Sequence, residues 1–147
     1  MTDQEKELVY RELCSRIPYG VKFLWDDHGL EGGSKVVKLY KVKVYGETID
    51  DYVFSGLGQP EPGYEYDCRI DDIKPYLRST SSMTDDEKKS YHFIKDILCE
   101  ACIHGTIESI AYWTESLNDW FYKYKFDLVG LIPKGLALEA PDEMYNV

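Results

Sequence analysis

The stretch 35-KVVKLYKVKVYG-46 decides the predicted fold, because its apolar and polar side chains alternate with a period of two. The part YKVKVY is a clear strand pattern, since successive side chains of a strand point to opposite faces of a sheet. Two further β-like runs flank it, GVKFLWDD before and ETIDDYVF after, and short glycine-containing turns join the three. We therefore expect an antiparallel meander.

The chain after this meander carries turn signals. SGLGQPEPGYEYD at 55–67 holds three glycines and two prolines, so we predict a loop there. CRIDDIKPYLRS at 68–79 reads as a short strand that runs into one helical turn, since Pro75 cannot donate to a strand ladder. STSSM at 79–83 is the predicted internal boundary.

A helix is predicted over residues 3–17, before a proline and a glycine that end it. Leu8, Leu13 and Ile17 fall near one face, and Glu12 is placed outside that face.

A second helix is predicted from about Asp85 to Ile103. Thr84 and Glu87 form a T-x-x-E capping box at its start, and Gly105 stops it.

The segment GTIESIAYW at 105–113 fits either a strand or a helix. We take Thr114 as the cap of the last helix, whose aromatic face includes Trp120 and Phe121. From Asp127 onward we predict turns, and we expect the tail DEMYNV to fray.

These elements predict a single α+β domain over residues 1–147. We expect a helix at 3–17, a β-rich part at 19–78 and a mainly helical part at 84–147. The β-rich part is predicted to be a small antiparallel sheet or a partly open SH3-like barrel, and it needs a covering layer to be stable.

The chain is acidic, with 27 Asp and Glu against 17 Lys and Arg and a formal net charge of −10. Nucleic-acid binding is disfavoured, because phosphates are neutralised by Lys and Arg. Residues 35–43 carry four lysines and no acid, so a local basic patch could survive. The 13 tyrosines suit a core boundary or a surface that binds a partner.

The compartment we expect is the cytoplasm. The N-terminal stretch MTDQEKELVYRELC lacks the basic start and apolar core of a signal peptide. No run approaches the roughly 18 apolar residues of a membrane span, so no membrane association is expected. The four cysteines then lie in a reducing environment, where stable disulfides are rare.

The segment CEACIH holds the weak metal candidates Cys99 and Cys102. A structural zinc needs four ligands, so Cys14, Cys68 or His28 would have to complete the site through the fold. We favour packing, with Cys102 inside the apolar stripe of its helix. Redox chemistry is disfavoured, because the pair lies at the C-terminal end of that helix. No cofactor is predicted.

No catalytic signature is present: G-x-S-x-G, the Walker loop and G-x-G-x-x-G are all absent. We therefore lean against an enzyme. The adjacent acids in the predicted turns are interpreted as solvated. The candidate partner-binding residues are two aromatic and two acidic side chains, Trp113, Tyr122, Asp50 and Asp51.

Three segments carry a family resemblance: RELCSRIPYGVKF (11–23), IDDIKPYLRSTSSMTDDEKKSY (70–91) and LNDWFYKYKFDLVGLIPKGLALEAPDEMYN (117–146). They resemble a family of short proteins from gut Bacteroidales genomes and their phages and mobile elements, for which no activity is established. The resemblance implies a bacterial or phage cytosolic origin.

Three functions fit these observations. The first is a small acidic cytosolic adaptor that binds another protein and serves as a phage or mobile-element accessory. The second is a zinc module or metal-dependent enzyme that uses Cys99 and Cys102. The third is a structural component that assembles with itself, and the sequence does not fix the oligomeric state.

Overall fold

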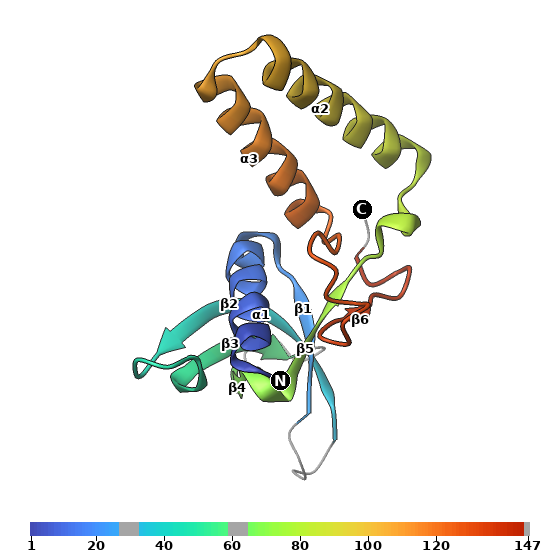
Figure 1. Cartoon of the computed structure of the whole chain (residues 1–147). Coiled ribbons are helices and arrows are strands. Elements are labelled where there is room, and N and C mark those ends of the chain that lie inside the picture. Colours follow the sequence, from blue (N-terminus) through green and yellow to red (C-terminus); the bar gives the residue numbers. More distant parts are fainter. Residues whose placement is uncertain (27–32, 59–64, 146–147) are drawn as a thin grey trace.

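The computed structural model describes residues 1–26, 33–58 and 65–145 and shows an α+β fold (Figure 1). An N-terminal helix, an open mixed sheet and two C-terminal helices confirm the predicted fold class. The elements, with 3-10 helices written as η, are α1 (Asp3–Arg16), η1 (Ile17–Tyr19), β1 (Lys22–Trp25), β2 (Lys35–Val44), η2 (Ile49–Asp51), β3 (Tyr52–Gly58), β4 (Glu65–Arg69), η3 (Ile70–Asp72), β5 (Ile73–Leu77), η4 (Thr80–Ser82), α2 (Asp85–His104), α3 (Ile107–Lys123) and β6 (Leu138–Glu139).

The sheet of the described residues has six strands in the order β4-β3-β2-β1-β5-β6. All neighbours from β4 to β5 are antiparallel, which confirms the predicted meander over β1, β2 and β3. The short strand β6 lies parallel to β5 and makes the sheet mixed. The sheet stays open, with β4 and β6 at its two ends.

The loop predicted over 55–67 is wrong at both ends, because β3 continues to Gly58 and β4 already begins at Glu65. Gly56 lies inside β3 for a steric reason. A Cβ atom at this position would clash with Cγ1 of Val37 in β2. Glycine here permits a close approach of two strands and does not signal a turn.

Helix α1 packs on the sheet and supplies part of the main core. Thr2 caps it, since the Thr2 hydroxyl accepts from Glu5 N and the Glu5 carboxylate accepts from Thr2 N. Val9 and Leu13 are fully buried. The side chains that complete this core are Val21, Phe23, Val37, Leu39, Phe54, Cys68, Ile70, Ile73, Leu77, Leu131, Leu136 and Ala137.

Glu12 was predicted outside the buried face of α1, and that prediction is wrong: its exposed fraction is 6%. The reason is the fully buried Arg16. Its Nη2 donates to Oε2 of Glu12 over 2.8 Å and to the carbonyl oxygen of Phe126 over 2.8 Å. A buried cation needs such partners, and the helical pattern does not reveal them.

Helix α2 begins where it was predicted, with the Thr84–Glu87 capping box in place. Helix α3 starts earlier than predicted, so the assignment of Thr114 as its cap is wrong. Thr106 caps it instead, and its hydroxyl accepts from Ser109 N. Among the described residues, none of the helices combines the length and apolar character that a membrane crossing requires.

Helices α2 and α3 form an antiparallel hairpin that projects away from the sheet (Figure 1). A second apolar cluster holds the base of the hairpin. Trp120 and Phe121 of α3 are buried there together with Phe126, and Tyr91 of α2 packs against them. The rings of Trp120 and Phe126 are stacked, with centroids 5.4 Å apart.

Arg78 joins this base to the sheet. Directly after β5, its backbone N donates to Lys125 O over 2.7 Å and its carbonyl accepts from Asp127 N over 2.9 Å. Its guanidinium donates to both carboxylate oxygens of Glu87, over 2.8 and 2.9 Å. The same group lies 4.4 Å from the centroid of the Phe126 ring. One side chain thus connects β5, α2 and the segment after α3.

The tail was predicted to fray, but Tyr145 anchors it within the described residues. In the β1–β5 register, Phe23 faces Pro75, so the next pair is Lys22 and Tyr76. The Tyr145 hydroxyl bridges that pair: it accepts from Lys22 N over 2.8 Å and donates to Tyr76 O over 2.9 Å. Burial raises the pKa of Tyr145 to about 12. A side-chain hydroxyl therefore continues the ladder where direct pairing stops.

Replacing Arg78 by Met should lower the free energy of unfolding by about 3 kcal/mol at pH 7, measured by urea denaturation. Glu87 would then stay charged without its partner, although its side chain is only 8% exposed. Burial raises the pKa of Glu87, but hydrogen bonds from Arg78 and Thr84 outweigh it and hold the pKa below its usual value. The stabilisation is therefore present above the ordinary glutamate pKa and is lost as the pH falls below about 4.

The double variant Arg78→Met/Glu87→Gln is the matched control, because it removes the uncompensated charge. It should regain part of the lost stability. A loss of the same size at pH 7 and pH 3.5, or no recovery in the double variant, would contradict this account of the Arg78–Glu87 pair.

Candidate functional site

The two cysteines of the predicted metal candidate lie in the last turns of α2, and both are exposed. The packing predicted for Cys102 is therefore wrong. The buried residue of this stretch is Ala101, with an exposed fraction of 8%. Helix α3 covers α2 on one side only (Figure 1), so the buried stripe is narrower than the apolar pattern suggests.

The other proposed metal ligands lie elsewhere. Cys14 is half-buried in α1, and Cys68 is buried in β4. His28 falls outside the described residues. In the part of the chain that the structure describes, no three His, Cys, Asp or Glu side chains form a group that could hold a metal ion.

The four thiols should react with Ellman's reagent at pH 8 in a fixed order. Cys99 and Cys102 are exposed and should react first, and Cys14 should follow. Cys68 should react only on unfolding, because burial raises its pKa to about 12 and the thiolate is the reactive form. The variant Cys99→Ser/Cys102→Ser should lose the fast phase. A Cys68 thiol that reacts as fast as the exposed pair would refute the burial of β4.

Asp50 and Asp51, two of the four candidate partner-binding residues, make local contacts around η2. Asp50 accepts a hydrogen bond from Lys6 Nζ over 2.6 Å, although its own side chain is 57% exposed. Asp51 caps η2, since its Oδ2 accepts from the backbone N and the hydroxyl of Thr48. These contacts stabilise the turn between β2 and β3.

The two aromatic candidates are half-buried. Trp113 meets the ring of Tyr112 edge-on, with centroids 5.1 Å apart. Tyr122 lies under the guanidinium of Arg16, 4.9 Å from its ring centroid. Arg16 and the Lys6 that binds Asp50 are ten positions apart on α1, or about 15 Å along the helix. The structure therefore spreads the four candidates over different parts of the molecule.

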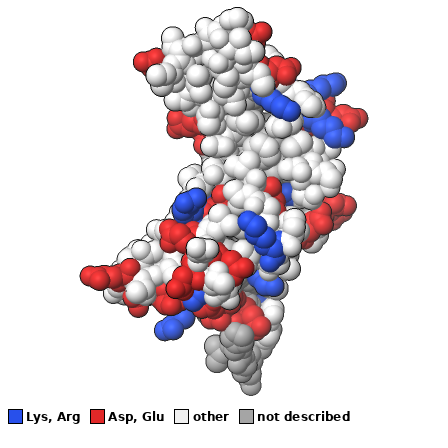
Figure 2. Space-filling model, in the orientation of Figure 1, with Lys and Arg blue, Asp and Glu red and all other residues white. Residues whose placement is uncertain are grey.

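The end of the hairpin is the most exposed apolar region. We define the distal hairpin as residues 96–119. Ile103, Ile107 and Tyr112 are exposed there by 72, 84 and 62%. The same segment contains no Lys or Arg but five acidic residues, Asp96, Glu100, Glu108, Glu115 and Asp119. In Figure 2 the upper part of the molecule shows mainly uncharged atoms with acidic side chains along its margins.

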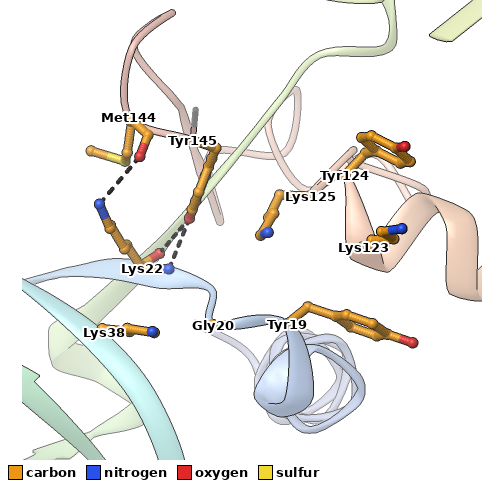
Figure 3. Close-up of a pocket in the computed structure, with 9 residues that line it drawn as sticks. All are labelled: Tyr19, Gly20, Lys22, Lys38, Lys123, Tyr124, Lys125, Met144 and Tyr145. Carbon is orange, nitrogen blue, oxygen red and sulfur yellow. Dashed lines mark hydrogen bonds between the residues drawn. The ribbon is translucent and has the colours of Figure 1, made fainter. Parts of the chain in front are cut away.

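A second feature is a pocket of about 550 Å³ at the base of the hairpin, which we call the lysine pocket (Figure 3). Five parts of the chain meet there: the turn at the end of η1, strand β1, strand β2, the end of α3 and the C-terminal tail. None of the lining residues is acidic. They are Tyr19, Gly20, Lys22, Lys38, Lys123, Tyr124, Lys125, Met144 and Tyr145.

Short contacts fix the walls of the lysine pocket. Lys22 Nζ donates to Met144 O over 3.2 Å, which ties β1 to the tail. Gly20 has a φ of 67°, and a Cβ atom there would stand 2.6 Å from Cε of Lys38. Glycine at this turn is therefore required both by its conformation and by the passage of the Lys38 side chain.

Comparison of the chain with protein-family models, curated proteins and solved structures finds no match.

The sequence missed the lysine pocket, although residues 35–43 carried a signal in their four lysines. The structure divides these lysines. Lys41 and Lys43 pair with Glu65 at 3.1 and 3.2 Å, whereas Lys38 reaches the pocket. Lys22 lies opposite Lys38 in the neighbouring strand β1. Lys123 and Lys125 come from the end of α3, which no local pattern connects with these strands.

Proposed function

We propose that this chain is a small acidic binding protein of the adaptor type, which docks its distal hairpin on a partner protein. The partner presents a basic surface with an apolar recess. The observation that carries the proposal is the exposure of Ile103 and Ile107 at the turn between α2 and α3. Clustered exposed apolar side chains are a feature of interaction sites.

Burial of these two isoleucines in a recess would contribute about 1.5–3 kcal/mol each. Helices project them beyond the rest of the fold (Figure 1), so a partner can reach them without a rearrangement of the sheet. The base of the hairpin is held by the Trp120–Phe126 cluster and by Arg78, so the protruding end is presented on a fixed support.

Charge selects the kind of partner. The five acids of the distal hairpin, without any Lys or Arg among them, favour a basic surface and repel a like-charged one. A second copy of this chain would bring the same five acids to the interface. The self-assembling structural component is therefore the less favoured alternative.

The metal alternative, the accessory role and the SH3-like relationship each rest on a separate observation. A zinc module or metal-dependent enzyme with Cys99 and Cys102 stays an alternative, supported by the exposure of both thiols. The family resemblance supports a phage or mobile-element accessory, and four free cysteines suit a reducing cytosol. An SH3-like relationship of β1 to β5 is supported by the position of β1 between β2 and β5, and by η3 before β5.

Site-specific photo-crosslinking tests the docking. A benzoylphenylalanine in place of Ile107, irradiated in a lysate of a gut Bacteroidales species, should capture one basic protein. Adding Ile103→Glu to the same chain should abolish the capture, because it places a charge in the apolar contact. High salt should weaken the capture, since the charge complementarity is screened.

The matched control carries the crosslinker at Tyr45, which is 71% exposed on the sheet side of the molecule. Equal capture at both positions would contradict docking through the distal hairpin. Capture of a second copy of the chain would establish self-assembly instead, and capture that requires added zinc would favour the metal module.

A further inference from the structure

The lysine pocket collects positive charge in a chain whose net charge is −10. Four amines, those of Lys22, Lys38, Lys123 and Lys125, line one hollow with no acid among its lining residues. Like charges at such short range repel each other. The arrangement therefore costs stability unless a negative ligand completes it.

Several lysines outside the pocket are paired with acids. Lys6, Lys41 and Lys43 each form ion pairs with a carboxylate at 2.6 to 3.2 Å. In contrast, none of the four pocket lysines has an acidic partner within the described residues. Single lysines without an ion pair, such as Lys74 and Lys89, also occur elsewhere in the described residues, but the pocket brings four of them together.

Lys125, which lines the pocket, has a strained backbone conformation. Its φ is 59°, which makes it the one non-glycine residue with positive φ in the described part of the chain. It follows the C-terminal residue of α3 by two positions, where glycine normally adopts this conformation. Burial lowers the pKa of Lys125, and the charges of Lys38 and Arg16 lower it further. Strained residues of this kind cluster at functional sites.

Arg16 lies beside the pocket, where it bonds the residue that follows Lys125. Its side chain is fully buried, and its Nη2 bonds Glu12 and the carbonyl of Phe126, next to Lys125. Its Nε and Nη1 are buried without an acceptor in the described residues. Buried donors without a partner are rare in native proteins and call for an explanation. The Glu12 carboxylate balances the charge of Arg16, so the positive charge of the pocket comes from its four lysines.

We propose that the lysine pocket binds a small phosphate ester that carries at least two negative charges and a ring. The amines of Lys38 and Lys125, which face the space beside Gly20 in Figure 3, hold the phosphate groups. Lysine is a common point-charge partner of phosphate. Tyr19, Tyr124 and Tyr145 line the same hollow. Lysine amines lie over the rings of Tyr124 and Tyr145, whereas the ring of Tyr19 has no aromatic or cationic contact among the described residues and can pack on the ring of the ligand.

The size and surroundings of the pocket favour a small ligand over a nucleic-acid strand. A volume of about 550 Å³ lies within the range of small-molecule sites, roughly 300–1,000 Å³. A long polyanion would also meet the negative charge of the remaining surface. This site is separate from the distal hairpin, so it stands independently of the proposed protein docking.

Isothermal titration calorimetry of the full chain with ADP, and separately with inorganic pyrophosphate, tests the proposal. ADP should bind with one site per chain, and more tightly than pyrophosphate. The variants Lys38→Met and Lys125→Gly should each weaken ADP binding roughly tenfold or more, as expected for a lost charged contact. The matched control Lys89→Met removes an exposed lysine of α2 and should change the affinity less than twofold.

Lys125→Gly also separates binding from folding. Glycine relieves the positive φ and removes one crowded charge, so this variant should melt at a higher temperature than the wild type while it binds ADP more weakly. If Lys125→Gly instead lowers both the melting temperature and the affinity for ADP, the positive φ of Lys125 is not strain linked to a binding site.

Four results would overturn the proposal. These are no heat of binding for either anion at low salt, an equal loss of affinity in Lys89→Met, pyrophosphate binding as tight as ADP, and tighter binding of a single-stranded oligonucleotide than of ADP. Pyrophosphate binding as tight as ADP would show that the ligand needs no ring. Tighter binding of the oligonucleotide would make the pocket part of a nucleic-acid site.

Discussion

The contacts of Arg78 with Glu87 and Phe126 join the helical hairpin to the sheet, and the arrangement of both candidate sites depends on them. Arg78 directly follows strand β5 of the six-stranded sheet, and its guanidinium bonds Glu87 of α2 and lies over the ring of Phe126 at the base of the hairpin. Its backbone also bonds Lys125 and Asp127, which fixes the chain as it leaves α3. The direction of the hairpin and the place of the Lys125 amine therefore depend on the same residue.

The two candidate sites show how the fold sorts charge. Acids without bases occupy the distal hairpin, and lysines without acids line the pocket at its base. On the outer face of the sheet, Lys43 is neutralised by Asp67. The net charge of −10 alone would suggest a uniformly acidic surface, but topology brings four lysines from three segments to one place. This separation of charge supports one binding role for the distal hairpin and another for the lysine pocket.

Local patterns in the sequence predicted the elements that local chemistry determines. The period-two alternation of 35–46 gave the meander, and the Thr84–Glu87 capping box gave the start of α2. The start of α3 was missed because β-branched residues after Thr106 suit strand and helix alike. Strand β4 was missed because the glycines of β3 suggested a loop, whereas Gly56 serves close packing.

The sites could not be predicted, because long-range contacts create them. Arg16 bonds the carbonyl of a residue 110 positions away, and Tyr145 bonds Lys22 across 123 positions. The exposure of Cys102 depends on which side of α2 is covered by α3. The apolar stripe in the sequence does not indicate that side. The sequence does show the surplus of acids and the four lysines of residues 35–43, of which Lys38 lines the pocket.

The most direct test is an NMR titration of the protein with ¹³C-dimethylated lysines, assigned by single Lys→Arg variants, during addition of ADP. The account predicts shifts confined to the methyl signals of Lys22, Lys38, Lys123 and Lys125, with the largest at Lys125. Equal shifts at all lysines, or shifts centred on Lys88 and Lys89 of α2, would show that the lysine pocket is not where this protein gathers an anion.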